Sequence, residues 1–260
     1  MRLKGNKAML ITTRGIVLRE KLVGENDKFI DVLTNDLGVI EISAKGARKI
    51  NAKNSPASQL FAYSKFCVQK RGERYYLNSS EPIHIFYDLR LDMEKLALAS
   101  YFAEIILFSA TSEEPSQEIL RLMLNSLEFL SSGKRNKEFL KSVFELRLLS
   151  EIGLMPDIVG CAECGAYLSD KMYFIFENGI ILCPTCYDLN LHAEAAQLSL
   201  PLLHAIRYIV LTEFEKLWNF KISDEVQKKL NYIAEKYLVL HLDKHFKTLE
   251  FYKSICSKEF

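Results

Sequence analysis

The sequence lacks any apolar run that approaches the roughly 18 residues of a membrane-spanning helix. Its basic start, from Met1 to Met9, lacks the apolar stretch that a secretory signal requires. Internal repeats and low-complexity tracts are also missing. We therefore expect a protein of the cytoplasm, where a reducing environment keeps its six cysteines as thiols and favours metal binding over disulfides.

The motifs of several enzyme classes are missing as well. There is no G-x-x-x-x-G-K-[ST] loop, no H-E-x-x-H and no G-x-S-x-G, so ATPase, zinc-protease and hydrolase interpretations lack their required residues. Four histidines, His84, His204, His241 and His245, are scattered, and the spacing of the last two is more typical of a helix face than of a metal pair. We predict a binding protein and not an enzyme.

The charge that is present is divided unevenly along the chain. The 260 residues carry 34 Lys and Arg against 33 Asp and Glu. Residues 1–80 hold 15 of the basic and 7 of the acidic residues, a balance of +8, which leaves 19 basic and 26 acidic residues, or −7, for residues 81–260. Such asymmetry is typical of a polyanion-binding module joined to an acidic body.

Short β-branched or aromatic runs occupy the first third of the chain and predict strands. They are Gly15–Leu18, Phe29–Leu33, Val39–Ile42 and Phe66–Val68. Asn35-Asp-Leu-Gly38 suits a turn between two of these runs, so residues 29–42 are predicted to form a hairpin. Four or five strands in about 70 residues indicate a small barrel or sandwich, and a barrel removes exposed sheet edges.

After Glu81-Pro82 the pattern becomes helical. Residues 94–108 are apolar on nearly every face, which is typical of a helix buried in a bundle. Further helices are expected between Pro115 and Gly133, over residues 137–152, from Ser199 and Pro201 to about Trp218, and after the capping residue Ser223. Linkers are expected near residues 78–83 and 154–160.

These patterns together predict an α+β multidomain protein. Residues 1–80 are expected to form a nucleic-acid-binding β domain. Residues 81–260 are expected to form a helical domain, into which a cysteine-containing segment, residues 158–190, is inserted.

The four cysteines of that segment have metal-ligand spacing. Cys161-Ala-Glu-Cys164 and Cys183-Pro-Thr-Cys186 are separated by 18 residues, within the range of a Cys₄ zinc ribbon or finger. Gly160 and Gly165 suit the tight turns, and a hairpin over residues 172–182 with a type I′ turn at Asn178-Gly179 would bring the two pairs together. Four thiolates leave no position for water, so we predict a structural zinc site.

Three other interpretations of these cysteines compete with structural zinc. Two disulfides conflict with a reducing compartment, and a redox Cys-x-x-Cys pair requires a thioredoxin-like βαβ context. A zinc nucleobase deaminase would need H-x-E before P-C-x-x-C, whereas here His192-Ala-Glu194 follows the cysteines and the proline lies between them. Cys67 and Cys256 are expected to be unligated thiols.

Basic residues near the predicted strands are candidates for contact with phosphates. Lys45, Arg48, Lys49 and Lys53 form a basic loop, and Lys70, Arg71 and Arg74 precede two rings, Tyr75 and Tyr76, on which bases could stack. The alternatives are a solvated surface loop and a Tyr pair that is split between core and surface. The regional charge of +8 favours binding.

Several strings in the chain carry a family resemblance. They are Gly15-Ile-Val-Leu-Arg19, Gly24-Glu-Asn-Asp27, Leu33-Thr34, Gly38 and Ala44-Lys-Gly-Ala-Arg48. In order and spacing they resemble the N-terminal signature of the bacterial recombination mediator RecO family. A second stretch, from Phe144 through Gly153 and Pro156 into Cys161-x-x-Cys164-Gly165, is similar to the family's helix that leads into its zinc-binding segment.

The resemblance implies an N-terminal OB-fold, a helical body and a zinc-binding segment. It also implies a cytoplasmic DNA-repair protein, nucleoid-associated during repair, that binds single- and double-stranded DNA and anneals complementary strands. The implied partners are the single-stranded-DNA-binding protein, RecR and RecA, which the family helps to load on DNA. Competing hypotheses are a nucleic-acid-modifying enzyme that grips its substrate with a zinc ribbon, and a scaffold for protein contacts.

The resemblance assigns DNA contact to Lys45 and Arg48, which lie in the matching Ala44–Arg48 string. Charge and position alone add Arg14, Lys49, Lys53, Arg71 and Arg74. Asp27 is expected to pin a turn. The predicted metal ligands are Cys161, Cys164, Cys183 and Cys186.

Overall fold

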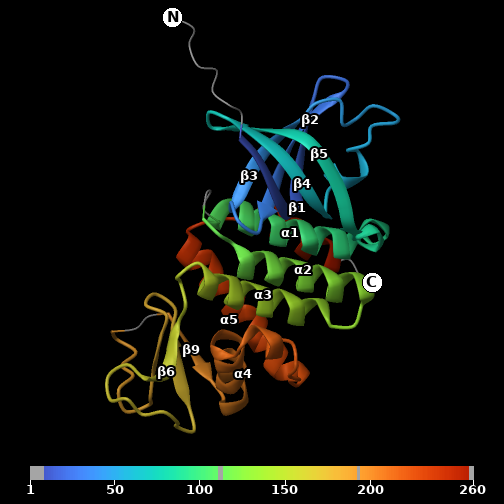
Figure 1. The fold of residues 1–260 in the computed structure, drawn as a ribbon. Helices are drawn as coiled ribbons and strands as arrows, with labels where there is room; N and C mark the ends of the chain where they lie inside the picture. The colour runs from blue at the N-terminus through green and yellow to red at the C-terminus, as the bar shows by residue number, and fades with distance from the viewer. Residues whose placement is uncertain (1–8, 111–113, 192–193, 258–260) are drawn as a thin grey trace, which may run out of the picture. The chain divides into compact units, whose positions relative to one another are not determined.

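The structure is a computed structural model that describes residues 9–110, 114–191 and 194–257 (Figure 1). Its contacts divide the chain into two compact units. The first unit comprises the described residues up to Ser132 together with those from Phe246 onward, and the second comprises Gly133–His245. Across the described ranges, no helix is both long enough and apolar enough to cross a bilayer.

The first unit begins with five strands that close on themselves. They are β1 (Met9–Val23), β2 (Asp27–Thr34), β3 (Val39–Ala44), β4 (Ala62–Arg71) and β5 (Arg74–Ile85). The strands form a closed barrel in the order β1-β2-β3-β5-β4, and β4 also pairs with β1. All pairs are antiparallel except β3 with β5.

The predicted hairpin over residues 29–42 is confirmed. β2 and β3 pair as far as Leu33 opposite Val39, and Gly38 in the connecting turn has a φ of +63°. Only glycine adopts a positive φ without a steric cost, which explains the position of the turn. The inward side chains of the barrel form one apolar cluster, namely Val17, Ile30, Val32, Ile40, Ile42, Phe66, Val68 and Tyr75.

The linker expected near residues 78–83 is wrong. These residues belong to β5, which pairs with β4 from Arg74 to Ile85. Exposed polar residues and Pro82 give the segment a loop-like composition, but Pro82 sits beside a register shift in the β4–β5 pairing. A proline is tolerated at such an irregularity because the missing N–H removes no regular ladder bond.

Helices complete the first unit. They are α1 (Met93–Ser109), α2 (Gln117–Ser132) and α6 (Lys247–Cys256), with short 3₁₀ turns η1 (Pro56–Ser58) and η2 (Tyr87–Leu91). Asp92 caps α1 by accepting hydrogen bonds from the backbone N–H groups of Glu94 and Lys95. α1 contacts both β1 and α6, which explains why it is apolar nearly all round.

The second unit combines a small sheet with three helices. Its elements are α3 (Lys137–Glu151), β6 (Asp157–Cys161), β7 (Met172–Ile175), β8 (Ile180–Leu182), β9 (Ala195–Leu198), α4 (Leu200–Leu211), η3 (Phe214–Lys216) and α5 (Asp224–Leu242). The sheet has the strand order β6-β8-β7-β9. α3 packs against α4 and α5, and α4 contacts β6. Part of the second expected linker, residues 157–160, is therefore strand β6.

Two helix predictions in this unit need correction. The helix that opens at Ser199 ends at Leu211, because Thr212 and Glu213 are extended and the chain turns to bury Phe214 and Trp218. α5 begins after Ser223, as predicted, but ends at Leu242, where Asp243 takes a left-handed conformation. His245 therefore lies beyond the helix, and the helix-face interpretation of His241 and His245 is wrong.

The α+β class, the β-rich N-terminal part and the helical C-terminal part are as expected. The boundary expected at residue 80 falls inside β5, and the change from strands to helices comes after Ile85. The contacts, by contrast, group α1, α2 and α6 with the barrel.

Candidate metal centre and nucleic-acid surface

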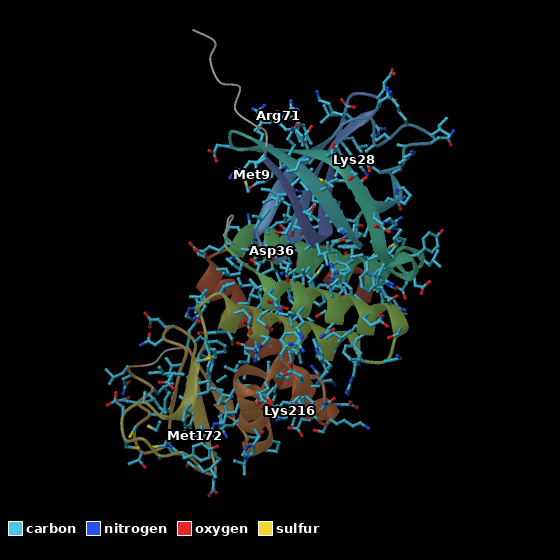
Figure 2. The ribbon with its side chains drawn as sticks, in the orientation of Figure 1. Met9, Lys28, Asp36, Arg71, Met172 and Lys216 are labelled. Carbon is cyan, nitrogen blue, oxygen red and sulfur yellow. The ribbon has the colours of Figure 1, made fainter. Side chains whose placement is uncertain are left out.

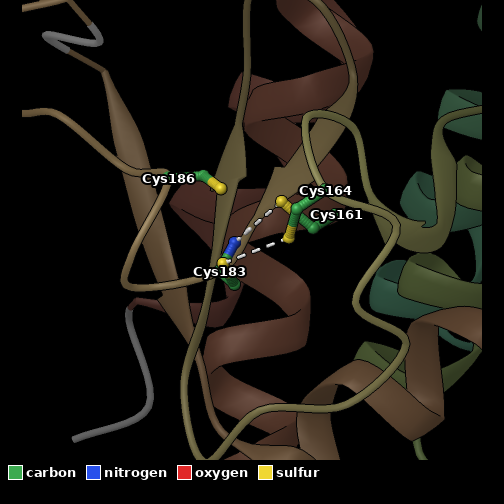
Figure 3. Close-up of side chains that lie close together, drawn as sticks. All are labelled: Cys161, Cys164, Cys183 and Cys186. Atoms are coloured by element: carbon green, nitrogen blue, oxygen red, sulfur yellow. Dashed lines mark hydrogen bonds between the residues drawn. The ribbon is translucent and has the colours of Figure 1, made fainter.

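The structure brings the four predicted cysteines together (Figure 3). Cys161 is the last residue of β6 and Cys183 directly follows β8, so the pairing of these two strands places one Cys-x-x-Cys pair beside the other. All four Sγ atoms lie within 4.8 Å of one another, and those of Cys164 and Cys183 are 3.7 Å apart.

These distances fit a tetrahedral metal ion. Zinc–sulfur bonds of about 2.3 Å require neighbouring sulfurs to lie about 3.8 Å apart. The cluster is therefore already close to the size that a four-thiolate site needs. It is also the only group of three or more His, Cys, Asp or Glu side chains with metal-binding spacing among the described residues.

Backbone hydrogen bonds shape the two turns that carry the sulfurs. The N–H of Gly165 donates to the carbonyl of Cys161 at 2.8 Å, and Gly165 has a φ of +74°, as the tight turn requires. In the second turn the N–H of Cys186 donates to the carbonyl of Cys183 at 3.1 Å. The N–H of Cys183 also points at the Sγ of Cys161, 3.3 Å away, and so links the two turns.

The surroundings lower the pKa of two of the four thiols and raise the pKa of the other two. Burial would raise the pKa of Cys161, but backbone N–H donors from Cys164, Cys183 and Glu163 outweigh it and lower the pKa to about 6. Burial also opposes the lowered pKa of Cys183, where the N–H of Cys186 is the leading donor. Side-chain hydrogen bonds to Cys183 and Cys164 raise the pKa of Cys186 to about 12. The N–H of Ala166 lowers the pKa of Cys164, but hydrogen bonds to Cys161 and Cys183 outweigh it and raise that pKa. A bound cation can replace the protons that remain.

The hairpin between the two cysteine pairs is confirmed, but its predicted turn is wrong. β7 and β8 pair as far as Ile175 opposite Ile180, which leaves a four-residue connection. Gly179 has a φ of +65°, whereas Asn178 is not among the residues with positive φ. A type I′ turn needs positive φ at both central positions, so this connection is of another type.

Helix α5 supports this hairpin. The Tyr237 ring packs edge-on against Phe174, and its hydroxyl donates to the carbonyl of Leu154 at 3.2 Å. Burial raises the pKa of Tyr237 to about 12. One turn further on, Nε2 of His241 donates to the carbonyl of Phe176 at 2.8 Å. His241 is thus a structural residue of this unit.

Arg207 of α4 is a functional neighbour that the sequence did not reveal. Its guanidinium is buried and donates to three backbone carbonyls, those of Ile158 (2.7 Å), Val159 (2.9 Å) and Tyr167 (2.7 Å). The first two belong to β6, which ends in Cys161. Arg207 therefore fixes the strand that positions the first metal ligand. An isolated arginine in an apolar helix was the only signal.

The residues of the deaminase alternative are not assembled as that chemistry requires. His192 lies outside the described residues. Glu194 forms an ion pair with Lys236 at 3.1 Å and is not part of the cysteine cluster. Cys67 and Cys256 belong to the first unit.

Three of the predicted DNA-binding residues converge on one face of the barrel. Lys45 and Arg74 line a hollow of about 610 Å³, and Lys45 and Arg71 line an adjoining hollow of about 390 Å³. Ser43 and Tyr76 border both hollows. We call Ser43, Lys45, Arg71, Arg74 and Tyr76 the β3–β5 groove.

The two tyrosines are divided between core and surface. Tyr75 is buried in the barrel cluster, so the hypothesis that its ring receives a base is wrong. Tyr76 is partly exposed, and the guanidinium of Arg71 lies 5.3 Å from its ring centroid. A ring and a cation in contact offer a base both a stacking surface and a partner for its phosphate.

The basic loop, residues 45–55, follows β3, and hydrogen bonds to the β1–β2 turn hold its start. Asp27 accepts a hydrogen bond from the N–H of Gly46 at 2.7 Å, which confirms that Asp27 pins a turn. The guanidinium of Arg48 donates to the carbonyl of Gly24 at 2.6 Å. The Gly24–Asp27 and Ala44–Arg48 strings, which both carry the family resemblance, are therefore hydrogen-bonded to each other. Arg48 makes a structural contact in addition to contributing a positive charge.

The remaining predicted cations lie elsewhere on the barrel. Lys49 and Lys53 are exposed on the loop. Arg14 lines a separate hollow of about 330 Å³ with Asp36 and Lys65, and it pairs across the strands with Lys65. Figure 2 shows Asp36 and Arg71 at opposite ends of the barrel, so the structure does not bring Arg14 to the β3–β5 groove.

Three cations of residues 1–80 are paired with carboxylates of the barrel. Lys28 is buried, 2.7 Å from both Glu20 and the carbonyl of Ser58. Arg19 and Lys21 are engaged with Asp31 at 2.6 and 3.3 Å. These three cations hold strands and loops together, and Glu20, Asp31 and Glu41 balance their charges, so the regional excess of +8 rests on the other cations of residues 1–80.

The fold and the cysteine cluster together define an α+β protein with a basic β-barrel and a four-cysteine group that can hold a metal ion. Residues 9–86 match the family model described as recombination protein O N terminal, and residues 90–250 match the one described as recombination protein O C terminal. The chain therefore belongs to the RecO family.

Relatives of similar length support this assignment. DNA repair protein RecO of Acetivibrio thermocellus is 34% identical over 94% of this chain and 97% of its own length. The protein of the same name from Alkaliphilus metalliredigens is 29% identical over 95% of this chain and 100% of its own length. The one from Caldicellulosiruptor bescii is 28% identical, with coverages of 95% and 99%.

Proposed function

We propose that this chain is a non-catalytic recombination mediator in DNA repair. It binds single- and double-stranded DNA, anneals complementary strands and assists RecA loading on DNA covered by the single-stranded-DNA-binding protein, with RecR as a partner. Its site of action is the cytoplasm, at the nucleoid during repair. The observation that carries the proposal is the convergence of Lys45, Arg71 and Arg74 around Tyr76 on the barrel of a RecO family protein.

In this proposal the barrel is an OB-fold and residues 1–80 are the DNA-binding domain. The groove cations neutralise phosphates and release counterions, while Tyr76 receives a base. Lys49, Lys53 and Arg48 extend the basic track along the loop, and Arg14 contacts DNA at the other end of the barrel. Glu41 and Glu73 also line the larger hollow, and Lys21, 2.7 Å from Glu41, offsets the charge of Glu41.

The four cysteines hold a structural zinc ion in this proposal. Zinc, when bound, supplies a cross-link between the two cysteine turns. The protein supplies thiolate character at Cys161 and Cys183, N–H donors that keep the sulfurs oriented, and Arg207 and His241 as supports of the surrounding sheet. Residues 81–260 form the helical domain into which this segment, residues 158–190, is inserted.

Fluorescence anisotropy of a labelled single-stranded oligonucleotide across a salt series tests the proposal. The key variant replaces Lys45, Arg71 and Arg74 with alanine. Since each phosphate contact contributes roughly 0.7 to the slope of log affinity against log salt for single strands, losing three contacts should make the slope shallower by about 2. Binding should also weaken in low salt.

A matched control replaces Lys134, Lys221 and Lys228 with alanine. All three are exposed cations of the other compact unit, so the change in net charge is the same. The control should bind like the wild type. Equal weakening by both triple variants would show that net charge and not the groove governs binding, and an absence of DNA binding by the wild type would refute the proposal.

A further inference from the structure

The tip of the basic loop presents an apolar side chain to solvent. Ile50 is 97% exposed, more than any other large apolar side chain among the described residues. Single exposed apolar residues are common on protein surfaces and need no special explanation. Three features of its surroundings distinguish Ile50 from such residues.

The first distinguishing feature is that the loop is fastened at its start. The N–H of Gly46 donates to Asp27 at 2.7 Å, the N–H of Arg48 donates to the carbonyl of Asn26 at 3.0 Å, and the Arg48 guanidinium donates to Gly24. The loop is therefore held to the β1–β2 turn by both backbone and side-chain bonds.

The second feature is that hydrogen bonds hold the end of the loop to β5 and also connect residues within the loop. Asn54 accepts from the N–H and the hydroxyl of Ser80 on β5, at 2.9 and 3.1 Å. Between the two anchors, the N–H of Lys49 donates to Gly46 and that of Ala52 donates to Lys49. Because the loop is pre-ordered, holding Ile50 outward costs little additional entropy on binding.

The third feature is the charge of the loop's own residues. Residues 45–56 contain four cations, Lys45, Arg48, Lys49 and Lys53, and no carboxylate side chain. A loop with only positive charge approaches a polyanion and not an ordinary apolar protein surface. The complementary ligand is a nucleic-acid backbone, whose bases offer the apolar surface next to its phosphates.

We propose that Ile50 is a wedge that enters the base stack of bound DNA between two adjacent bases. The flanking lysines hold the phosphates on either side while the isoleucine replaces base–base contact with base–side-chain contact. Apolar side chains inserted between base steps act in this way in DNA-deforming proteins. An isoleucine makes no hydrogen bond to base edges, so the insertion does not depend on sequence. This inference rests on the proposed function, since it requires DNA binding.

The test uses DNA with 2-aminopurine, whose fluorescence rises when the base is unstacked, in single-stranded and duplex oligonucleotides. The full-length wild-type protein should raise the fluorescence in at least one of the two forms. Ile50→Ala should abolish that rise and weaken binding by roughly tenfold, a scale set by the loss of three buried carbon atoms against the cost of unstacking. Ile50→Leu should keep the rise.

Two further variants separate insertion from charge and from general surface effects. Lys49→Ala should make the salt slope shallower by about 1, whereas Ile50→Ala should leave the slope unchanged because it removes no charge. Leu91→Ala removes another highly exposed apolar side chain, 72% exposed on η2 of the same unit, and should change neither readout.

The outcomes distinguish this inference from the proposed function. Wild-type binding without a rise in fluorescence, or a rise that Ile50→Ala retains, would overturn the wedge and leave the DNA-binding proposal standing. Failure of the wild type to bind either oligonucleotide would refute both. Since the Ile50 side chain makes almost no contact within the protein, a folding defect does not obscure the result.

Discussion

Removal of the Arg207 guanidinium is the sharpest test of how the second unit supports its cysteines. Arg207 reaches from α4 to three carbonyls around β6, and its guanidinium also lies 4.2 Å from the ring of Tyr167. Arg207→Met keeps an unbranched side chain and a similar helix propensity but loses every donor. Arg207→Lys keeps the charge but cannot form the same fork.

The magnitude follows from the three bonds. A hydrogen bond that involves a charged group contributes about 1.5–3 kcal/mol, and a buried carbonyl left without a partner costs about 1–3 kcal/mol. Water can replace the guanidinium at Val159 and Tyr167, which are about half exposed, but not at the fully buried Ile158. We therefore expect Arg207→Met to lower the free energy of unfolding of this unit by about 3–5 kcal/mol, and Arg207→Lys by less.

Two assays measure the effect. Trp218 is the single tryptophan of the chain and is buried in the same unit, so its fluorescence during urea unfolding reports the stability of that unit. The second assay follows the release of metal from the metal-loaded protein to a coloured chelator. Release should be faster in Arg207→Met because the strand that ends in Cys161 loses its support.

Arg135→Met is the matched control. Arg135 also donates to backbone carbonyls, those of Trp218 and Phe220, but these bonds do not involve β6. It should lower stability without accelerating metal release beyond what its stability loss accounts for. If Arg207→Met releases metal no faster than the wild type, the assignment of Arg207 as a support of the metal site is refuted.

Two further predictions follow from the second unit. Cys183→Ser should lose bound metal and destabilise the unit, yet retain binding to the single-stranded oligonucleotide; elemental analysis that finds unchanged metal in the purified variant would contradict it. Lys141 is buried with Glu145 and Glu235, each 2.9 Å away, so Lys141→Met should cost about 3–5 kcal/mol at neutral pH by leaving carboxylates uncompensated. Burial lowers the Lys141 pKa, but the two carboxylates outweigh it and raise the pKa, so this stabilisation is present below the unfolded pKa of about 10.4 and is lost as the pH rises through the folded value. Urea unfolding at about pH 7 and about pH 11, on either side of that unfolded value, should therefore show a smaller difference between wild type and variant at the higher pH, and an equal difference would contradict the pKa assignment.

Local signals in the sequence were enough to locate most elements. Short β-branched or aromatic runs, the turn at Gly38, the cap at Ser223 and the all-apolar stretch at residues 94–108 each specify their structure through contacts within a few residues. The predictions were wrong where contacts with residues far away in the sequence determine the local structure. Residues 78–83 have the composition of a loop but form a strand because β4 pairs with them.

The cysteine cluster and the β3–β5 groove differ in how far local sequence predicts them. The cysteine spacing alone indicated a common metal site, because two Cys-x-x-Cys turns have few other uses in a reducing compartment. The spacing of the basic residues did not indicate which of them share one surface. Only the closed barrel shows that Lys45, Arg71 and Arg74 meet, that Arg14 lies elsewhere, and that Tyr75 is buried.

Spacing along the chain was therefore sufficient for the α+β class, the family and the four cysteines. Tertiary packing determines which cations share one surface, that Lys28 and Lys141 are internal, and that Arg207 and His241 hold the cysteine sheet. The difference arises because the role of a charged or polar side chain depends on partners far away in sequence. Barrel closure and helix packing determine those partners, so patterns within a short stretch of sequence do not predict them.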